Sequence, residues 1–273
     1  MNDSRITDAA RRVVRAFTYH PAGVAAKSLA GTALWKLAAP ALRTRVSVPL
    51  SVFEAGGVGV HTEPLAVLRR LFPGAAANSV EGLRREYEEL TEEVRARFDR
   101  GAATLARTEN RGLESRTSLT LYASARLSRP ATILETGVAD GWSTFLLLHA
   151  VARNGSGSVH SVDIHADVGA LLTDDERRSW NFHQIDERRP EAGFRALVGR
   201  LPAVDFYFHD ADHRYLGQRF EYEAVLPQTA EGAVLGSDDV QASPAFVEFC
   251  ARHELTPVLL VDRLTVSGWA MKP

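Results

Sequence analysis

Apolar positions change their spacing near residue 130, and this change divides the sequence into two parts. Between Asn78 and about residue 106, apolar residues recur at steps of three or four, which predicts one long amphipathic helix. Asn78-Ser-Val-Glu81 resembles a capping box at its start. A second helix is expected from about residue 113 to residue 127, before Arg129-Pro130 ends it. The stripe of the first helix consists of Val80, Leu83, Tyr87, Leu90, Val94 and Phe98.

Beyond Pro130 the pattern becomes a series of short apolar segments separated by helical segments. This alternation predicts an α/β fold with a doubly wound, mostly parallel, seven-stranded sheet. Too few residues separate the last two segments for a helical crossover, so we expect an antiparallel last strand. The seven expected strands cover residues 132–135, 158–163, 181–185, 204–209, 233–237, 257–261 and 265–271.

The first 75 residues have a less regular pattern, in which Ala-rich helical pieces alternate with prolines and a glycine-rich loop precedes residue 60. We therefore expect two regions. Residues 1–110 form an N-terminal helical extension, and residues 111–273 form the main domain. The extension acts either as a lid over a ligand crevice or as an oligomerisation surface, because apolar helix faces serve both purposes.

Composition narrows the class of protein. The chain has 273 residues, of which 45% are hydrophobic, and a net charge of −2, which is typical of a globular protein and argues against a nucleic-acid partner. A single cysteine, Cys250, excludes an intramolecular disulfide and a cysteine-rich metal site. No stretch of about 18 uncharged apolar residues occurs, so we expect no membrane partner and a cytoplasmic location. Acidic residues exceed basic ones beyond residue 120, and we look there for functional carboxylates.

A glycine turn joins the first expected strand to the next helix, in Glu135-Thr-Gly-Val-Ala-Asp-Gly-Trp-Ser143. Gly137 permits a sharp turn, and Gly141 lets the backbone approach a ligand closely. Asp163 ends the second strand, where a carboxylate can accept hydrogen bonds from both ribose hydroxyls. The spacing Gly-x-x-x-Gly differs from the dinucleotide fingerprint, so S-adenosylmethionine fits better than a nicotinamide dinucleotide. A purely structural turn, with Asp163 as a surface cap, stays open.

Acidic residues also follow two strands that should be neighbours in this sheet. Asp210 follows the strand 204–209, and Asp238 and Asp239 follow the strand 233–237. Such carboxylates would meet at one edge and raise one another's pKa unless a cation lay between them. A hard divalent cation would satisfy them, with Mg²⁺ favoured and Mn²⁺ or Ca²⁺ as alternatives.

His213 lies three residues after Asp210 and can face the same crevice. Its ordinary pKa near 6.5 suits a proton acceptor at neutral pH. Each feature also has a structural reading, since Asp-Asp after a strand is common in turns and a loop histidine is usually solvated. Glu221, on the following helix, would be either a supporting group or a surface charge.

Together these segments resemble class I S-adenosylmethionine-dependent methyltransferases over about residues 113–273. They are most similar to the metal-dependent O-methyltransferase branch, which includes catechol O-methyltransferase, the macrolide-sugar O-methyltransferases and cephalosporin-hydroxylase-like proteins. The resemblance implies a Rossmann-like methyltransferase fold. It also implies that Glu135, Gly137 and Ser143 line the methionine end of the cofactor and that Asp186 contacts adenine. The chain departs from the family pattern beside that position, with Ile185 where the family usually has glycine.

The expected reaction is metal-assisted methylation of a hydroxyl on a sugar or polyhydroxylated natural product. His213 would act as the general base, because the sugar-modifying relatives keep a histidine at the matching position. Three alternatives stay open: a catechol-type phenol as acceptor, a metal-independent methyltransferase, and a non-catalytic cofactor-binding scaffold. The sequence also leaves open whether the protein forms a homo-oligomer.

Overall fold

The computed structural model of the chain describes residues 50–55, 57–101, 115–262 and 265–273. The expected boundary near residue 110 between extension and main domain lies outside these residues, as does the end of the long helix expected to reach residue 106. No helix within the described ranges is long and apolar enough to cross a membrane.

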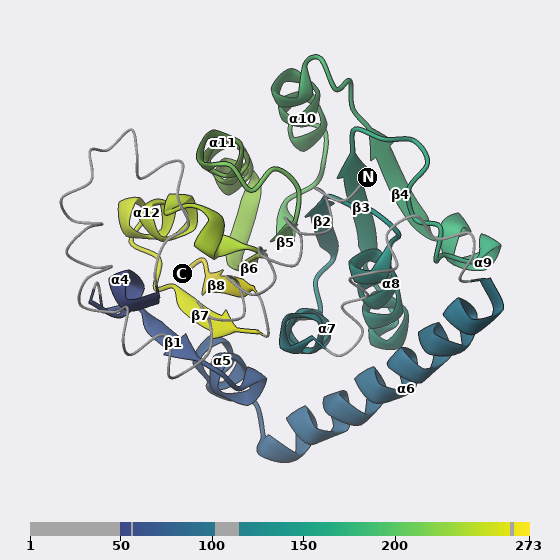
Figure 1. The fold of residues 1–273 in the computed structure, drawn as a ribbon, viewed down its shortest axis with the longest axis horizontal. Coiled ribbons are helices and arrows are strands. Elements are labelled where there is room, and N and C mark those ends of the chain that lie inside the picture. Colours follow the sequence, from purple (N-terminus) through teal and green to yellow (C-terminus); the bar gives the residue numbers. More distant parts are fainter. Residues whose placement is uncertain (1–49, 56, 102–114, 263–264) are drawn as a thin grey trace, which may run out of the picture.

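One mixed sheet of eight strands forms the centre of the described structure, in the order β1-β7-β8-β6-β5-β2-β3-β4 (Figure 1). Every pair of neighbours is parallel except those of β8, which runs antiparallel to β6 and to β7. The strands are β1 (Gly59–His61), β2 (Thr132–Thr136), β3 (Ser158–Asp163), β4 (Trp180–Gln184), β5 (Val204–His209), β6 (Thr229–Ser237), β7 (Val258–Val261) and β8 (Val266–Met271).

All seven predicted strands are present, and the predicted antiparallel last strand is confirmed. The eighth strand, β1, was not predicted, because Gly59 was assigned to the end of a glycine-rich loop and Val60 and His61 to no element. Its three residues are too few to show alternation, the first of them is a glycine, and two further glycines precede it. β1 forms because it pairs in parallel with β7, with Val60 opposite Leu259.

Helices cover both faces of the sheet (Figure 1). One face carries α5 (Pro64–Leu71), α6 (Ala77–Gly101), α7 (Arg116–Ser128) and α8 (Trp142–Asn154), whose apolar side chains share one core cluster. The opposite face carries α4 (Leu50–Ala55), α10 (Pro190–Val198), α11 (Tyr215–Val225) and α12 (Ala245–Arg252), around a second cluster. The short α9 (Asp174–Arg178) leads into the edge strand β4, and two single turns, η3 (Leu226–Gln228) and η4 (Val240–Ala242), flank β6.

The predicted apolar stripe of the long helix is confirmed at four positions, since Leu83, Tyr87, Leu90 and Val94 are all buried. α6 crosses beneath α7 and α8 and reaches α9 (Figure 1). The expected capping box is misplaced, because the helix begins at Ala77 and Asn78 already lies inside it. α7 begins at Arg116, where the Ser115 hydroxyl accepts a hydrogen bond from the Ser118 N–H and so caps the helix.

Candidate active site

The sheet order reverses between β2 and β5, and ligands of doubly wound sheets bind outside the carboxyl ends of the strands at such a point. The glycine turn lies there. Gly137 has a φ of 82°, and a Cβ at this position would lie 2.0 Å from the carbonyl oxygen of Asp210. Only glycine fits both the left-handed conformation and this contact. The turn that follows β2 is therefore packed directly against the residue that follows β5.

Gly141 shows a similar requirement at the start of α8. Its φ is 91°, and a Cβ there would lie 2.9 Å from the Cα of Gly169. The turn is thus in backbone contact with the loop after β3, residues 164–173. Two hydrogen bonds join these segments, from the Gly169 N–H to the Ala139 carbonyl (2.8 Å) and from the Leu171 N–H to the Asp140 carbonyl (2.9 Å).

Glu135 is fully buried at the base of the turn. Its Oε2 accepts hydrogen bonds from the hydroxyls of Thr144 and Ser161, both at 2.6 Å. Burial raises the pKa of Glu135, although these hydroxyls and that of Ser143 oppose the shift. Its Oε1 is buried without a hydrogen-bond partner among the described residues. A donor group of a ligand could fill that position.

Asp163 ends β3, as predicted, beside the glycine turn. Its two carboxylate oxygens accept hydrogen bonds from the N–H groups of Val138 and His165, both at 2.9 Å. A carboxylate has about four acceptor sites, so these bonds hold the side chain in place and leave capacity for ribose hydroxyls. Asp186 lies exposed after β4, where it accepts the N–H of Arg188 at 2.9 Å.

Three aspartates, Asp210, Asp238 and Asp239, lie at the adjacent ends of β5 and β6. These strands pair in parallel up to His209 opposite Ser237. Burial and the charges of Asp238 and Asp239 raise the pKa of Asp210 well above its ordinary value. Burial and the charge of Asp239 likewise raise the pKa of Asp238 to about 7. Among the described residues, the ion pairs of Asp210 and Asp239 are with His213, and none is with an arginine or a lysine.

His213 lies between two of these carboxylates. Its Nε2 is 3.7 Å from Asp210 Oδ1 and 3.6 Å from Asp239 Oδ2, too far for hydrogen bonds. Burial lowers the pKa of His213, and the charge of Asp239 opposes this shift. A lowered pKa keeps the imidazole neutral, which is the form that accepts a proton.

Asp210, Asp238 and Asp239 partly fit a divalent cation. Their oxygens are the donor type that Mg²⁺ prefers, and Asp238 Oδ1 is buried without a hydrogen-bond partner in the described structure. They do not, however, bring one oxygen each within 4.8 Å of one another. The donor chemistry and the charge therefore suit the ion, whereas the side chains are more widely spread than in a formed coordination shell.

A buried network beneath the site was missed by the sequence reading, except that Glu221 was considered a supporting group. Glu221 Oε2 accepts hydrogen bonds from the hydroxyls of Thr136 (2.7 Å) and Tyr207 (2.9 Å) and lies 2.8 Å from Nδ1 of His209. Burial opposes ionisation of Glu221, but His209 and these hydrogen bonds lower its pKa overall. The ring centroids of His209 and His213 lie 5.8 Å apart, with the two rings edge to face. The network therefore supports the ring of His213.

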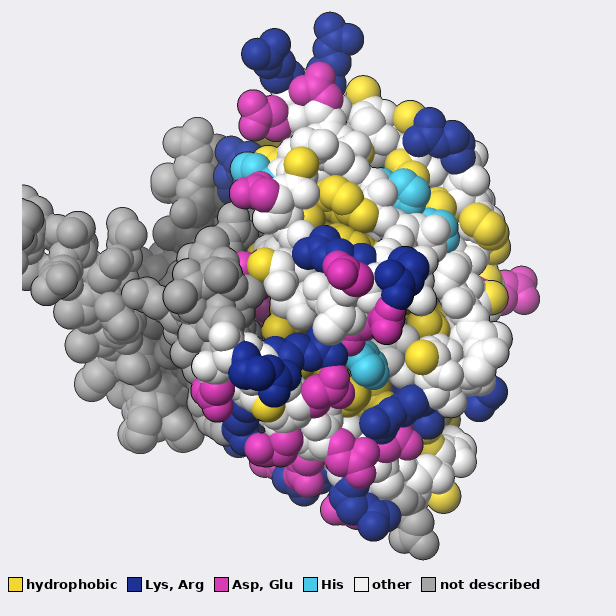
Figure 2. All heavy atoms as spheres, turned by 90° about the vertical axis from the view of Figure 1, so that its right-hand side faces the viewer, with side chains coloured by type: hydrophobic (Ala, Val, Ile, Leu, Met, Phe, Trp, Pro, Cys, Tyr) yellow, Lys and Arg dark blue, Asp and Glu magenta, His cyan; other side chains and the backbone are white. Residues whose placement is uncertain are grey.

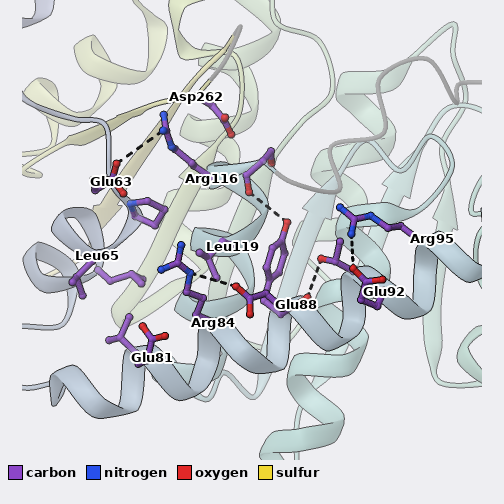
Figure 3. A pocket seen from close by; sticks show the side chains of 16 residues that line it. Glu63, Leu65, Glu81, Arg84, Glu88, Glu92, Arg95, Arg116, Leu119 and Asp262 are labelled. Carbon is purple, nitrogen blue, oxygen red and sulfur yellow. Dashed lines mark hydrogen bonds and ion pairs between the residues drawn. The ribbon is translucent and has the colours of Figure 1, made fainter.

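A pocket of about 660 Å³ lies between α5, α6 and the start of α7 (Figure 3). Asp262, which follows β7 at the carboxyl edge of the sheet, lies at one end of it. Polar and apolar side chains line it together, and Arg84 and Glu88 form an ion pair on its wall (3.5 Å). The lining includes Glu63, Leu65, Leu68, Val80, Tyr87, Arg116 and Leu119.

Residues 134–240 match a family described as "Methyltransferase domain". No curated protein matches the chain. Among solved structures, the O-methyltransferase TomG from Streptomyces achromogenes, in complex with SAM, is similar at 17% identity and a TM-score of 0.46, over 58% of this chain and 80% of that one.

Two further structures are similar to this chain. An O-methyltransferase from Bacillus cereus, in complex with SAH, has 15% identity and a TM-score of 0.46, over 76% of this chain and 97% of that one. A putative caffeoyl-CoA O-methyltransferase from Staphylococcus aureus has 12% identity and a TM-score of 0.49, over 72% of this chain and 100% of that one. Likeness at this level says nothing of the acceptor.

Proposed function

We propose that the protein is an S-adenosylmethionine-dependent methyltransferase that methylates a hydroxyl oxygen of a small molecule, because residues 134–240 match a methyltransferase-domain family. The observation that carries the proposal is the position of His213. Its Nε2 lies between Asp210 and Asp239, and the backbone of Asp210 contacts the glycine turn. This position supports His213 as the proton acceptor beside the turn that would hold the methyl donor.

The cofactor would bind along the glycine turn. The N–H groups at the start of α8 suit the carboxylate of its methionine part, above the buried Glu135 and beside Ser143. Asp163 would accept hydrogen bonds from the ribose hydroxyls, and Asp186 would face adenine at the next strand end. Gly137 and Gly141 allow the turn to pack against the backbone of Asp210 and of Gly169.

Asp210, Asp238 and Asp239 would hold the divalent cation, with Mg²⁺ favoured by their all-oxygen donor set. When bound, such an ion lowers the pKa of the acceptor hydroxyl and fixes its position. His213 takes the hydroxyl proton at Nε2, and the neighbouring carboxylate of Asp239 favours the protonated imidazole that results. His209 packs edge to face against this ring and is itself held by Glu221.

The acceptor we propose is a sugar or another polyhydroxylated natural product. The mixed polar and apolar lining of the pocket between α5, α6 and α7 supports a large acceptor with many hydroxyls, and it also supports a role of the N-terminal helices in acceptor binding (Figure 3). A catechol-type phenol is the second candidate, favoured by the same group of carboxylates, since two adjacent hydroxyls would suit a shared cation.

Transfer of a labelled methyl group tests the proposal. The protein, S-adenosylmethionine with a labelled methyl and Mg²⁺ are incubated with panels of polyhydroxylated sugars and of catechols, and the labelled product is quantified. We expect a methyl ether on one panel, and kcat lowered about 100-fold to 10,000-fold in His213→Asn. His253→Asn is the matched control, because His253 pairs with Glu223 at the end of α12.

Each part of the proposal has its own contradicting outcome. Labelled methyl on neither panel argues against O-methyl transfer to these acceptors. Undiminished turnover in excess EDTA rejects the metal and leaves the metal-independent enzyme. Wild-type kcat in His213→Asn rejects this histidine as the base.

A further inference from the structure

Arg97, in the last third of α6, is an arginine of the N-terminal region that is held by the main domain. Only 14% of its side chain is exposed. Its Nη1 and Nη2 donate to the two carboxylate oxygens of Glu176 in α9, at 2.7 and 2.8 Å. Its guanidinium also lies 4.8 Å from the ring centroid of Phe145 in α8. Such a two-pronged, partly buried pair is among the stronger ionic contacts in proteins.

The Arg97 guanidinium also contacts the loop 164–173, which packs against the glycine turn. Arg97 Nη1 donates to the carbonyl of Leu171 at 3.3 Å, and the N–H of Leu171 donates to the carbonyl of Asp140 at 2.9 Å. Leu171 is therefore hydrogen-bonded both to Arg97 and to the glycine turn. The contact between Gly141 and Gly169 fixes the same two segments to each other.

The far end of that loop is fixed by the same carboxylate. Glu176 Oε2 accepts the N–H and the hydroxyl of Thr173, which caps α9, at 2.8 and 2.9 Å. His149 Nε2 lies 2.9 Å from Glu176 Oε1. On the face that carries α9 and the end of α6, acidic and basic side chains lie side by side (Figure 2). The contacts of Arg97 and Glu176 thus hold α6, α8, α9 and the loop together.

Glu93, His149 and Glu176 bring one ligand atom each within 4.8 Å, the spacing of a metal site. Arg97 forms ion pairs with both glutamates, and its charge already satisfies them. A cation there would compete with the guanidinium, so the cluster is better explained as an ion-pair network that joins elements.

We propose that Arg97 is a positioning residue for the cofactor, so that attachment of α6 and binding of S-adenosylmethionine are coupled. This inference rests on the proposed cofactor site at the glycine turn. Arg97 holds the loop 164–173 against residues 137–141 and so fixes the turn in its binding conformation. Because coupling between two equilibria is reciprocal, the bound cofactor must in turn strengthen the attachment of α6.

Calorimetry with S-adenosylhomocysteine tests the first direction without any acceptor. The proteins compared are wild type, Arg97→Lys, Arg97→Gln and the control Arg85→Gln, which alters an exposed arginine of the same helix. We expect the Kd to rise about 5-fold to 100-fold in Arg97→Gln and less in Arg97→Lys, which keeps the charge but loses the two-pronged geometry. The control should retain the wild-type Kd.

Hydrogen exchange tests the second direction. S-adenosylhomocysteine should slow amide exchange in residues 77–101 of the wild type and of Arg85→Gln, and it should do so much less in Arg97→Gln. A merely structural arginine would lower the melting temperature of the protein without changing the Kd at a temperature where the variant is folded.

The outcomes separate this inference from the proposed function. A wild-type Kd in a folded Arg97→Gln, or no ligand-dependent protection of α6, overturns the inference. Failure of the wild type to bind S-adenosylhomocysteine overturns the cofactor site instead. If Arg97→Gln does not fold, the folded Arg97→Lys decides, because an unchanged Kd and unchanged protection there overturn the inference as well.

Discussion

Charge at individual positions decides what the candidate site can bind. Asp210, Asp238 and Asp239 concentrate negative charge beside His213, whereas Asp163 lies beside the glycine turn and is held by two backbone N–H groups. The first group suits a cation and a hydroxyl proton, and the second suits ribose. The two kinds of carboxylate can therefore be separated by substitution.

Asp163→Ala is expected to weaken S-adenosylhomocysteine binding by at least about tenfold, because it removes a carboxylate that can take two charge-assisted hydrogen bonds. Asp238→Ala should affect Mg²⁺ and acceptor binding more than cofactor binding. Calorimetry with S-adenosylhomocysteine and with Mg²⁺ measures both affinities. If both substitutions change only the cofactor affinity, the assignment of the acids is wrong.

Packing between elements depends on a few buried or half-buried polar contacts as well as on the apolar cores. Glu86 of α6 accepts hydrogen bonds from Tyr122 (2.6 Å) and Arg126 (2.9 Å) of α7. Its hydrogen bond with Arg126 is the largest cause that lowers the pKa of Glu86 to about 2. At the edge of the sheet formed by β4, a ring nitrogen of His160 in β3 lies 3.1 Å from a ring nitrogen of His183 in β4.

Glu86→Gln is expected to lower the free energy of unfolding by about 1 to 3 kcal/mol at neutral pH, because it weakens charge-assisted hydrogen bonds between α6 and α7. The folded pKa of Glu86 is lowered, so its stabilisation is present above its ordinary pKa of 4.5 and is lost as the pH falls towards about 2. Urea unfolding at several pH values measures this. A difference between variant and wild type that persists unchanged in acid would contradict it.

The pair of His160 and His183 should also make stability depend on pH, but nearer to neutral pH than Glu86 does. Burial lowers the pKa of both histidines, and the charge of His160 lowers that of His183 further. The unfolded chain then binds protons first, so stability is expected to fall as the pH decreases below about 6.5. Unfolding of His183→Asn between about pH 7.5 and pH 5 should show a smaller decrease than wild type. Equal slopes would exclude the pair as a cause.

At the scale of the whole molecule, the described N-terminal elements are joined to the central sheet. β1 extends the sheet through β7, and α5 and α6 share an apolar core with α7 and α8. Ligand binding at the carboxyl edge should therefore stabilise one cooperative structure that includes these N-terminal elements.

Saturating S-adenosylhomocysteine is expected to stabilise the protein by about 2.7 kcal/mol at a hundredfold excess over its Kd, with a single thermal transition. Differential scanning calorimetry with and without ligand measures the shift. Two separate transitions, with only one shifted, would show that the N-terminal elements unfold independently of the proposed cofactor site.

The sequence alone determined seven of the eight strands, their mostly parallel arrangement and the edge of the sheet at which the candidate site residues lie. These features follow from local rules, since apolar spacing identifies elements and every parallel strand brings its carboxyl end to the same edge. The sequence therefore suffices to select Gly137, Asp163, Asp210 and His213 as candidates.

The tertiary structure decided the contacts that no local pattern contains. β1 exists because of a partner about 200 residues away, and Arg97 meets Leu171 across 74 positions of the chain. The burial of Glu221 and the spacing of the three aspartates likewise depend on how neighbouring elements pack. Hydrophobic periodicity records which face of an element is buried, but it does not record which distant side chain lies opposite, and that pairing controls charge and geometry in the site.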